Sequence, residues 1–254
     1  MTKAPSTKAT KPRATASLPI AYDEQLAREA ADIAKRIAAP SGDRIRFRSS
    51  KGFTTPDGFE GDTLEVVVID FVSANMFYDR PFIPDDPSAP ACFAIGPEPT
   101  LLAPSANSPE VQSTSCSVCP NNQFGSAPNG KGKACKNTRL LAVTPFAALD
   151  DPEATPPIWI MAVPPTSMKG FDSYVKGLAT RFQTVPIGVL TQVTMNPQVD
   201  YANPQFTARR RLEAEEIGFF MPLRSEAQER LRTEPDVSTF EPYEPPAPKS
   251  RVRR

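Results

Sequence analysis

The chain of 254 residues is 39% hydrophobic and 23% charged, a balance typical of a globular protein with one substantial core. Its 29 basic and 29 acidic side chains cancel, so net charge singles out no polyanionic partner. No apolar run approaches the roughly 20 residues of a membrane span, and the N-terminus lacks a leader pattern. We therefore expect a cytoplasmic protein.

The first part of the chain predicts a tail followed by a helix. Residues 1–19 are basic, contain no acidic residue and hold too little apolar surface to fold, so we expect a disordered tail there. Over residues 22–38 the apolar positions recur at helical spacing, which predicts an amphipathic helix that ends before Pro40. We expect one folded domain over residues 20–231.

Arginine alternates strictly with apolar residues in the next segment, Arg-Ile-Arg-Phe-Arg at 44–48. A strand with this period places Arg44, Arg46 and Arg48 on one face and the apolar side chains on the other. Together with Lys51, the arginine face is a candidate platform for the phosphates or bases of a nucleic acid. The alternative is the solvated face of an ordinary half-buried strand.

Regular periodicity ends after a β-branched run at 64–71, which predicts a well-buried strand. Residues 81–136 are rich in Pro, Asn, Ser and Gly, and a loop of that length inside a compact domain requires its own stabilisation. We then expect strands at 140–143, 158–163 and 187–193, a helix at 168–182, and a short strand with a charged helix within 205–231. The proline-rich remainder, 232–254, predicts a disordered tail.

Four cysteines lie within the long loop or at its edge. They are Cys92, Cys116, Cys119 and Cys135, with the spacing C-x23-C-x2-C-x15-C. Because the chain contains no histidine, a tetrahedral zinc site would need four thiolates, and these cysteines supply them with none left over. A reducing compartment disfavours disulfides, which favours metal binding. We predict structural zinc that stabilises the loop; the alternative is an iron–sulfur cluster on the same four thiolates.

The order of elements predicts a mainly β protein with helices, of the α+β class. Two strands, a long loop, a strand, a helix and a further strand fit a small closed β-barrel. The OB fold is the commonest nucleic-acid-binding barrel of this kind. We therefore expect an OB-like barrel over residues 20–231, with a metal-binding insertion at 81–136.

Three segments resemble a family of bacteriophage proteins: PACFA at 90–94, CSVCPNNQFGSA at 116–127 and GKGKACKNTRLLAV at 130–143. They are also similar to segments of zinc-containing phage single-stranded DNA-binding proteins, and the resemblance covers roughly residues 44–195. It implies an OB-like barrel that carries a metal-bound subdomain. It also implies a protein that coats unwound single strands during DNA replication or recombination, within a bacterial host cell if a phage encodes it. On this resemblance the C-terminal tail is a candidate surface for replication or recombination proteins.

Binding a single strand without sequence choice requires basic side chains for the phosphates and aromatic faces for the bases. The basic candidates beside the last cysteine are Lys131, Lys133, Lys136 and Arg139. The aromatic candidates, which lie in expected turns or in the metal loop, are Phe53, Phe77, Tyr78, Phe82 and Phe124. For each of them, packing in the core is the alternative, and Trp159 is expected in the core.

Two other functions are left open by the sequence. Asp70, at the end of a buried strand, is a candidate first carboxylate of a two-metal nuclease, with Asp79, Asp85 or Asp86 as its partner. An ordinary strand-end acid is the alternative for Asp70. The zinc loop and the tails could instead form a module that binds other proteins. The absence of histidine excludes Ser-His and Cys-His catalysis, so we favour a protein that is not an enzyme.

Overall fold

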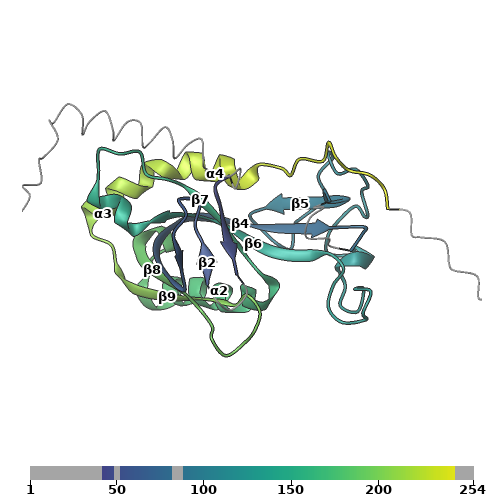
Figure 1. Ribbon diagram of the computed structural model, residues 1–254, viewed down its shortest axis with the longest axis horizontal. Helices are drawn as coiled ribbons and strands as arrows, with labels where there is room; N and C mark the ends of the chain where they lie inside the picture. Colours follow the sequence, from purple (N-terminus) through teal and green to yellow (C-terminus); the bar gives the residue numbers. More distant parts are fainter. Residues whose placement is uncertain (1–41, 49–51, 82–87, 244–254) are drawn as a thin grey trace, which may run out of the picture. The chain divides into compact units, whose positions relative to one another are not determined.

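The computed structural model describes residues 42–48, 52–81 and 88–243 (Figure 1). The expected N-terminal tail, the helix at 22–38 and the last eleven residues of the expected C-terminal tail lie outside these ranges. So do four candidate site residues, Lys51, Phe82, Asp85 and Asp86. Contacts divide the chain after Gly42, and the features described below belong to the unit that begins at Asp43.

Nine strands of the described residues form one sheet with the order β3-β2-β1-β7-β6-β4-β8-β9, and β5 pairs with β4 off this path. Their bounds are β1 Arg44–Phe47, β2 Phe53–Thr54, β3 Glu60–Gly61, β4 Thr63–Phe77, β5 Cys92–Gly96, β6 Lys136–Pro145, β7 Trp159–Val163, β8 Val189–Met195 and β9 Pro204–Arg211. Neighbouring strands are antiparallel, except that β1 and β7 are parallel. The sheet is curled (Figure 1), which confirms a mixed, barrel-like α+β fold.

Helices cover both faces of the sheet. They are α2 (Pro165–Gly177), continued by a π-helical turn at Leu178–Phe182, α3 (Ala214–Phe220) and α4 (Arg224–Arg232). One apolar cluster joins Phe220 and Leu231 of α3 and α4 to the sheet, and a second joins Phe171 of α2 to the opposite face. Phe171, which is fully buried, packs edge-on against Phe71 and Phe206. None of the helices in the described ranges has the length and hydropathy needed to cross a bilayer.

The strand β4 contains a β-bulge that changes which of its side chains face which layer. Val68 lies opposite Val143 and Asp70 lies opposite Ala142, so Ile69 is an extra residue in β4. A bulge of this kind shifts the alternation of side chains by one position. Consequently both Ile69 and Asp70 face the layer of α3 and α4.

The second half of β4 extends beyond β8 and forms a smaller sheet. Residues 63–66 of β4 pair with β8, whereas residues 73–77 pair with β5. This smaller sheet, which we call the distal sheet, contains residues 73–77 of β4, the whole of β5, and residues 136–139 of β6. The segment between β5 and β6, residues 97–135, is called the cysteine loop, and its regular structure is one 3-10 turn at Pro120–Asn122. This arrangement attaches the cysteine loop to the distal sheet at both of its ends.

The predicted strands at 44–48, 64–71, 140–143, 158–163 and 187–193 and the predicted helix at 168–182 are confirmed, with shifted bounds. Two expectations are wrong. Residues 81–136 are not structureless, because Cys92 begins strand β5. Residues 233–243, expected to be a free tail, make contacts: the carboxylate of Glu234 accepts hydrogen bonds from Ser105 and Asn107, both at 2.6 Å.

The start of α3 is stabilised by a charged capping box. The backbone N–H of Glu213 donates to the carboxylate of Glu216 at 2.8 Å, and the guanidinium of Arg210 donates to it at 2.6 and 2.7 Å. The hydrogen bonds from Arg210, together with the one from Glu213, lower the pKa of Glu216 to about 2. The carboxylate is therefore bound more strongly when it is ionised.

We expect Glu216→Gln to lower the melting temperature at pH 7 by about 2–4 °C, the usual scale for a lost cap in a domain of this size. Because the folded-state pKa is lowered, the stabilisation is present above the ordinary pKa of 4.5 and is lost as the pH falls toward about 2. Melting curves of both proteins between pH 7 and 2 should therefore converge. Glu215→Gln, exposed on the same turn, is the control, and a difference independent of pH would contradict the prediction.

Candidate metal and nucleic-acid site

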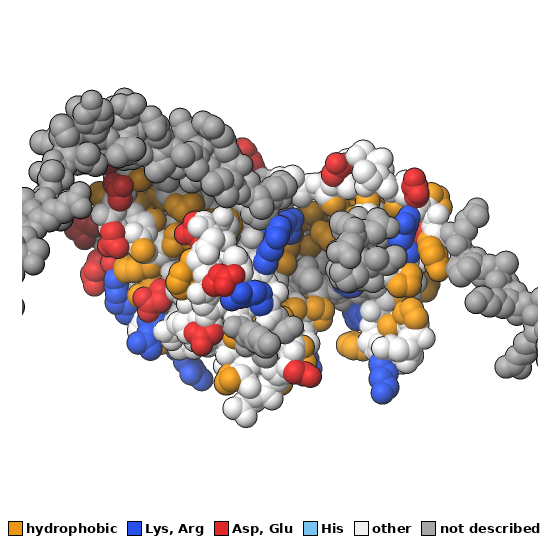
Figure 2. Space-filling model, in the orientation of Figure 1, with side chains coloured by type: hydrophobic (Ala, Val, Ile, Leu, Met, Phe, Trp, Pro, Cys, Tyr) orange, Lys and Arg blue, Asp and Glu red, His pale blue; other side chains and the backbone are white. Residues whose placement is uncertain are grey.

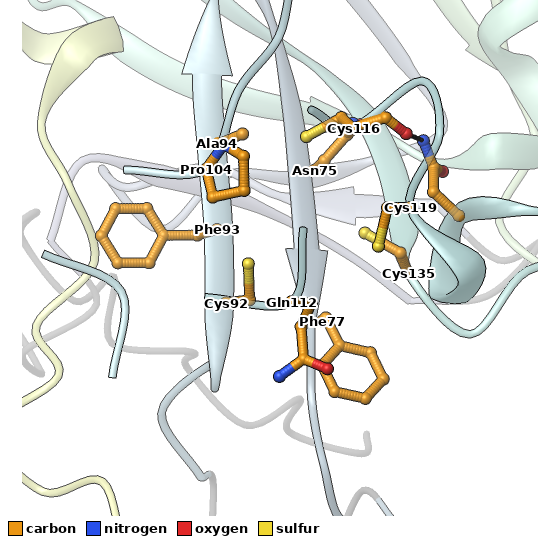
Figure 3. Close-up of a pocket in the computed structure, with 11 residues that line it drawn as sticks. Asn75, Phe77, Cys92, Phe93, Ala94, Pro104, Gln112, Cys116, Cys119 and Cys135 are labelled. Carbon is orange, nitrogen blue, oxygen red and sulfur yellow. Dashed lines mark hydrogen bonds between the residues drawn. The ribbon is translucent and has the colours of Figure 1, made fainter. Parts of the chain in front are cut away.

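All four cysteines line one small cavity against the distal sheet (Figure 3). Cys92 lies on β5, Cys116 and Cys119 lie in the cysteine loop, and Cys135 immediately precedes β6. Each cysteine is 6–8% exposed and has a free thiol. The cavity has a volume of about 10 Å³, which is room for one ion or one water molecule and excludes an organic substrate.

The sequence Cys-Pro-Asn-Asn-Gln explains the local shape of the loop around the cavity. Pro120 begins the 3-10 turn, and the side-chain amides that follow bind the backbone of the cysteines. Asn122 Nδ2 donates to the carbonyl of Cys116 at 2.7 Å, and Gln123 Nε2 donates to the carbonyl of Cys119 at 3.1 Å. The backbone N–H of Cys135 donates to the carbonyl of Asn121 at 2.7 Å. Two side-chain amides and one backbone hydrogen bond thus hold three of the cysteines around the turn.

The cavity opposes ionisation of its thiols. Burial raises the pKa of Cys116, and burial raises the pKa of Cys135 to about 12. The other cysteines contribute to both shifts, because thiolates in one cavity repel one another. A cation in the cavity would reverse this effect, since the thiolate is the form that binds metal. Binding of a divalent ion should therefore release protons.

The four cysteine thiols are suitable ligands for a metal ion, but their side chains are not arranged around one. In residues 42–48, 52–81 and 88–243, no group of three or more His, Cys, Asp or Glu side chains is arranged to hold a metal ion as it stands. Figure 3 nevertheless shows all four sulfur atoms around the same cavity. Four thiolates suit tetrahedral zinc, and they suit an iron–sulfur cluster equally well. Closing either site would require the thiols to move together.

Two lysines next to the last cysteine lie over aromatic rings. Lys133 Nζ is 5.3 Å from the ring centroid of Phe124, and Lys136 Nζ is 5.0 Å from that of Tyr78. Phe124, in the cysteine loop, is 85% exposed. Burial raises the pKa of Tyr78, and the positive charge of Arg44 opposes the shift. Each pair presents a ring together with positive charge, the combination that a single strand requires.

The two pairs lie on different sides of the distal sheet. Asn75 and Phe77 of β4 line the cysteine cavity. Met76 faces the other way, and Tyr78 is on the same side as Met76 because its hydroxyl donates to the sulfur of Met76 at 3.7 Å. Lys136 lies opposite Met76 in the ladder. In Figure 2, basic and hydrophobic side chains are interleaved over the part of the molecule that carries β5 and the cysteine loop in Figure 1.

One candidate nucleic-acid contact is wrong, and three others have partners within the fold. The side chain of Phe53 is fully buried in the core beside α2. Phe77 lines the cysteine cavity. Arg139 is paired with Asp172 of α2 at 3.3 Å, and its side chain is only 13% exposed. Arg48 is paired with Glu60 at 2.8 Å, but its side chain is 45% exposed and it stays a candidate.

The remaining candidates, which keep an exposed or partly exposed side chain, are Arg44, Arg46, Tyr78, Phe124, Lys131, Lys133 and Lys136. The predicted alternation in the first strand is confirmed, because Arg44 and Arg46 are exposed while Ile45 is buried. Trp159 is in the core, as predicted. The pairing of each lysine with a particular ring was not predicted, because it joins residues that are separated along the chain.

Asp70 has a structural role in the fold. Its carboxylate accepts hydrogen bonds from Gln228 at 2.8 Å and from Arg224 at 3.5 Å, so it joins β4 to α4. Asp79, proposed as a partner carboxylate, accepts a hydrogen bond from the backbone N–H of Tyr243 at 2.7 Å. Among the described residues, neither carboxylate belongs to a group that could hold a metal ion. Asp70 lies in the middle of β4 and not at a strand end as expected, and these contacts give it a structural role.

No protein-family model, curated protein or solved structure matches this chain. The function is therefore inferred from the cysteine cavity, from the two lysine–aromatic pairs and from the resemblance of the cysteine segments to phage proteins.

We expect Asp70→Ala to destabilise the protein by about 1–2 kcal/mol, because it leaves the partly buried donor of Gln228 without its acceptor and removes the exposed contact with Arg224. Urea unfolding, followed by far-ultraviolet circular dichroism, measures the change. Asp151→Ala, at an exposed position, is the control. An unchanged unfolding midpoint would contradict the structural role, and magnesium-dependent cleavage of single strands that is lost in Asp70→Ala would support the nuclease alternative.

Proposed function

We propose that this protein binds single-stranded DNA and coats unwound strands during replication or recombination, without catalytic turnover. The observation that carries the proposal is the composition of one region. Four buried thiols line one cavity there. One lysine–aromatic pair lies in the cysteine loop, and a second pair lies on the other side of the distal sheet. In this proposal the curled sheet is an OB-like barrel, and the distal sheet with the cysteine loop is its inserted metal-binding part.

The side chains support a mode of binding that depends on charge and stacking. The ring of Phe124 is open to solvent, so a base can stack on it while Lys133 remains near the adjacent phosphate. Tyr78 and Lys136 provide a second pair. Neither pair offers the directed donors and acceptors that read base edges. The proposal is therefore binding without sequence choice.

The metal in this proposal orders the cysteine loop. The apolar cluster associated with the loop contains three residues, Ala94, Leu102 and Cys116, whereas each face of the main sheet carries a large cluster. Burial of so little apolar surface offsets only a small part of the entropy lost when 39 residues become ordered. A zinc ion held by Cys92, Cys116, Cys119 and Cys135 would supply the remaining stabilisation. All four thiols are free, which agrees with the reducing cytoplasm that the proposal assumes.

We expect the purified protein to contain about one zinc per chain and no visible colour. Cys119→Ser should lose most of the metal and melt at a lower temperature, because it removes one of four ligands. Elemental analysis and an absorption spectrum measure the first result, and thermal unfolding measures the second. Val118→Ser, at the exposed neighbouring position, is the control. Iron with visible absorption would favour the cluster, and a metal-free protein would contradict the metal centre.

We expect Phe124→Ala to weaken binding of a single-stranded oligonucleotide by about 5- to 100-fold, the effect of losing 1–3 kcal/mol of stacking. The control is Phe182→Ala, which removes another exposed phenylalanine, from the turn after α2. Fluorescence anisotropy with a labelled oligonucleotide measures both variants. Wild-type affinity should also fall steeply with salt, with a logarithmic slope of about −0.7 per phosphate contact. No binding to any oligonucleotide would favour the protein-interaction module.

A further inference from the structure

A buried asparagine on β4 lies at the edge of the cysteine cavity. Asn75 is 6% exposed, lines the cavity, and lies directly opposite Asn137 of β6 in the antiparallel ladder. Asn137 Nδ2 donates a hydrogen bond to Asn75 Oδ1 at 2.6 Å. Because the side-chain oxygen of Asn75 accepts from β6, its amide nitrogen points elsewhere.

The side chain of Asn75 lies beside that of Cys116 in the cavity. Figure 3 shows the two side chains next to each other at one end of the cavity. Burial raises the pKa of the Cys116 thiol, and the neighbouring amide of Asn75 opposes this shift. Asn122 Nδ2 binds the carbonyl of the same cysteine at 2.7 Å. The cysteine loop therefore holds Cys116 at its backbone, with the amide of Asn75 from the distal sheet next to its side chain.

We propose that Asn75 is a positioning residue of the metal centre: it donates a hydrogen bond to the metal-bound thiolate of Cys116, and Asn137 fixes its orientation. This inference rests on the proposed metal centre at the four cysteines. Sulfur that is bound to a metal remains a hydrogen-bond acceptor, and donors around metal ligands fix their orientation and tune the site. The relay Asn137–Asn75–Cys116 satisfies both ends of the Asn75 amide in a buried location.

Asparagine is suited to this position for a specific reason. An aspartate of the same shape would have no donor for the sulfur and would add a negative charge beside it, and leucine would offer neither donor nor acceptor. Serine is too short to span from β6 to the cysteine. The bulge at Ile69 also matters, because a shift of one residue would turn Asn75 to the face of Met76, away from the cavity.

The test measures metal affinity by competition with a chromophoric zinc chelator, using the full chain with Asn75→Leu or Asn75→Asp. We expect zinc affinity to fall by about 10- to 100-fold in Asn75→Leu, the usual effect of losing a hydrogen-bond partner of a ligand, and further in Asn75→Asp. The control is Thr144→Val, which removes a buried hydroxyl group from β6 at a position that does not line the cavity.

Cobalt substitution provides a readout that general destabilisation would not change. The sulfur-to-cobalt charge-transfer bands should shift in Asn75→Leu, because this variant removes a hydrogen bond to a metal-bound thiolate. They should not shift in Thr144→Val, which removes no such hydrogen bond. If Asn75→Leu does not fold, Asn137→Ala tests the same relay while leaving the amide of Asn75 in place, and it should weaken zinc binding.

The outcomes separate this inference from the proposed function. A wild-type protein that binds no zinc contradicts the metal centre itself. A wild-type protein that binds zinc, together with Asn75 and Asn137 variants of equal affinity and unchanged cobalt spectra, overturns the relay and leaves the metal centre standing.

Discussion

One strand runs through both the main sheet and the distal sheet, and the register of that strand determines the faces of both. In β4, alternate side chains pack against α2 on one side and against α3 and α4 on the other. The extra residue Ile69 shifts the alternation midway along the strand. As a result Asp70 meets α4, and farther along the strand Asn75 and Phe77 meet the cysteine cavity. The position of every candidate site residue on β4 follows from this single insertion.

The main and distal parts differ in what stabilises them. The main sheet is enclosed by two large apolar clusters, whose burial is the dominant favourable term in folding. Within the cysteine loop, hydrogen bonds from Asn121, Asn122, Gln123 and Ser126 connect one part of the loop to another. Hydrogen bonds between Phe93 of β5 and the loop residues Ser105 and Ser108 join the loop to the distal sheet, and each such bond contributes only about 1 kcal/mol. A region built in this way depends on an added ligand far more than the main sheet does.

Much of the fold could be predicted from the sequence because alternation and β-branched runs report burial directly. The strand containing Arg44 and Ile45 and the strand containing Trp159 are examples. The strand β5 was missed because PACFAIG is short, follows prolines and does not alternate. Phe53 was assigned wrongly, since a two-residue strand has no periodicity that could report its burial.

The candidate site was predictable only in part, for a related reason. Its residue types, cysteine, lysine and phenylalanine, are visible in the sequence, but their neighbours are not. The Lys136–Tyr78 pair depends on the β4–β6 register, and the loss of Arg139 to Asp172 depends on the packing of α2. The relay through Asn75 was not foreseen, because an asparagine in a strand gives no signal of the residue opposite it.

Three consecutive residues at the start of β6 have three different tasks. Cys135 faces the cavity, Lys136 lies over Tyr78, and Asn137 binds Asn75. Since an insertion or deletion among them would exchange their faces, evolution should preserve the length of this tripeptide in related chains. The glycine-rich segment just before it, where Gly125 and Gly132 are joined by a backbone hydrogen bond at 2.6 Å, is free to lengthen or shorten between species.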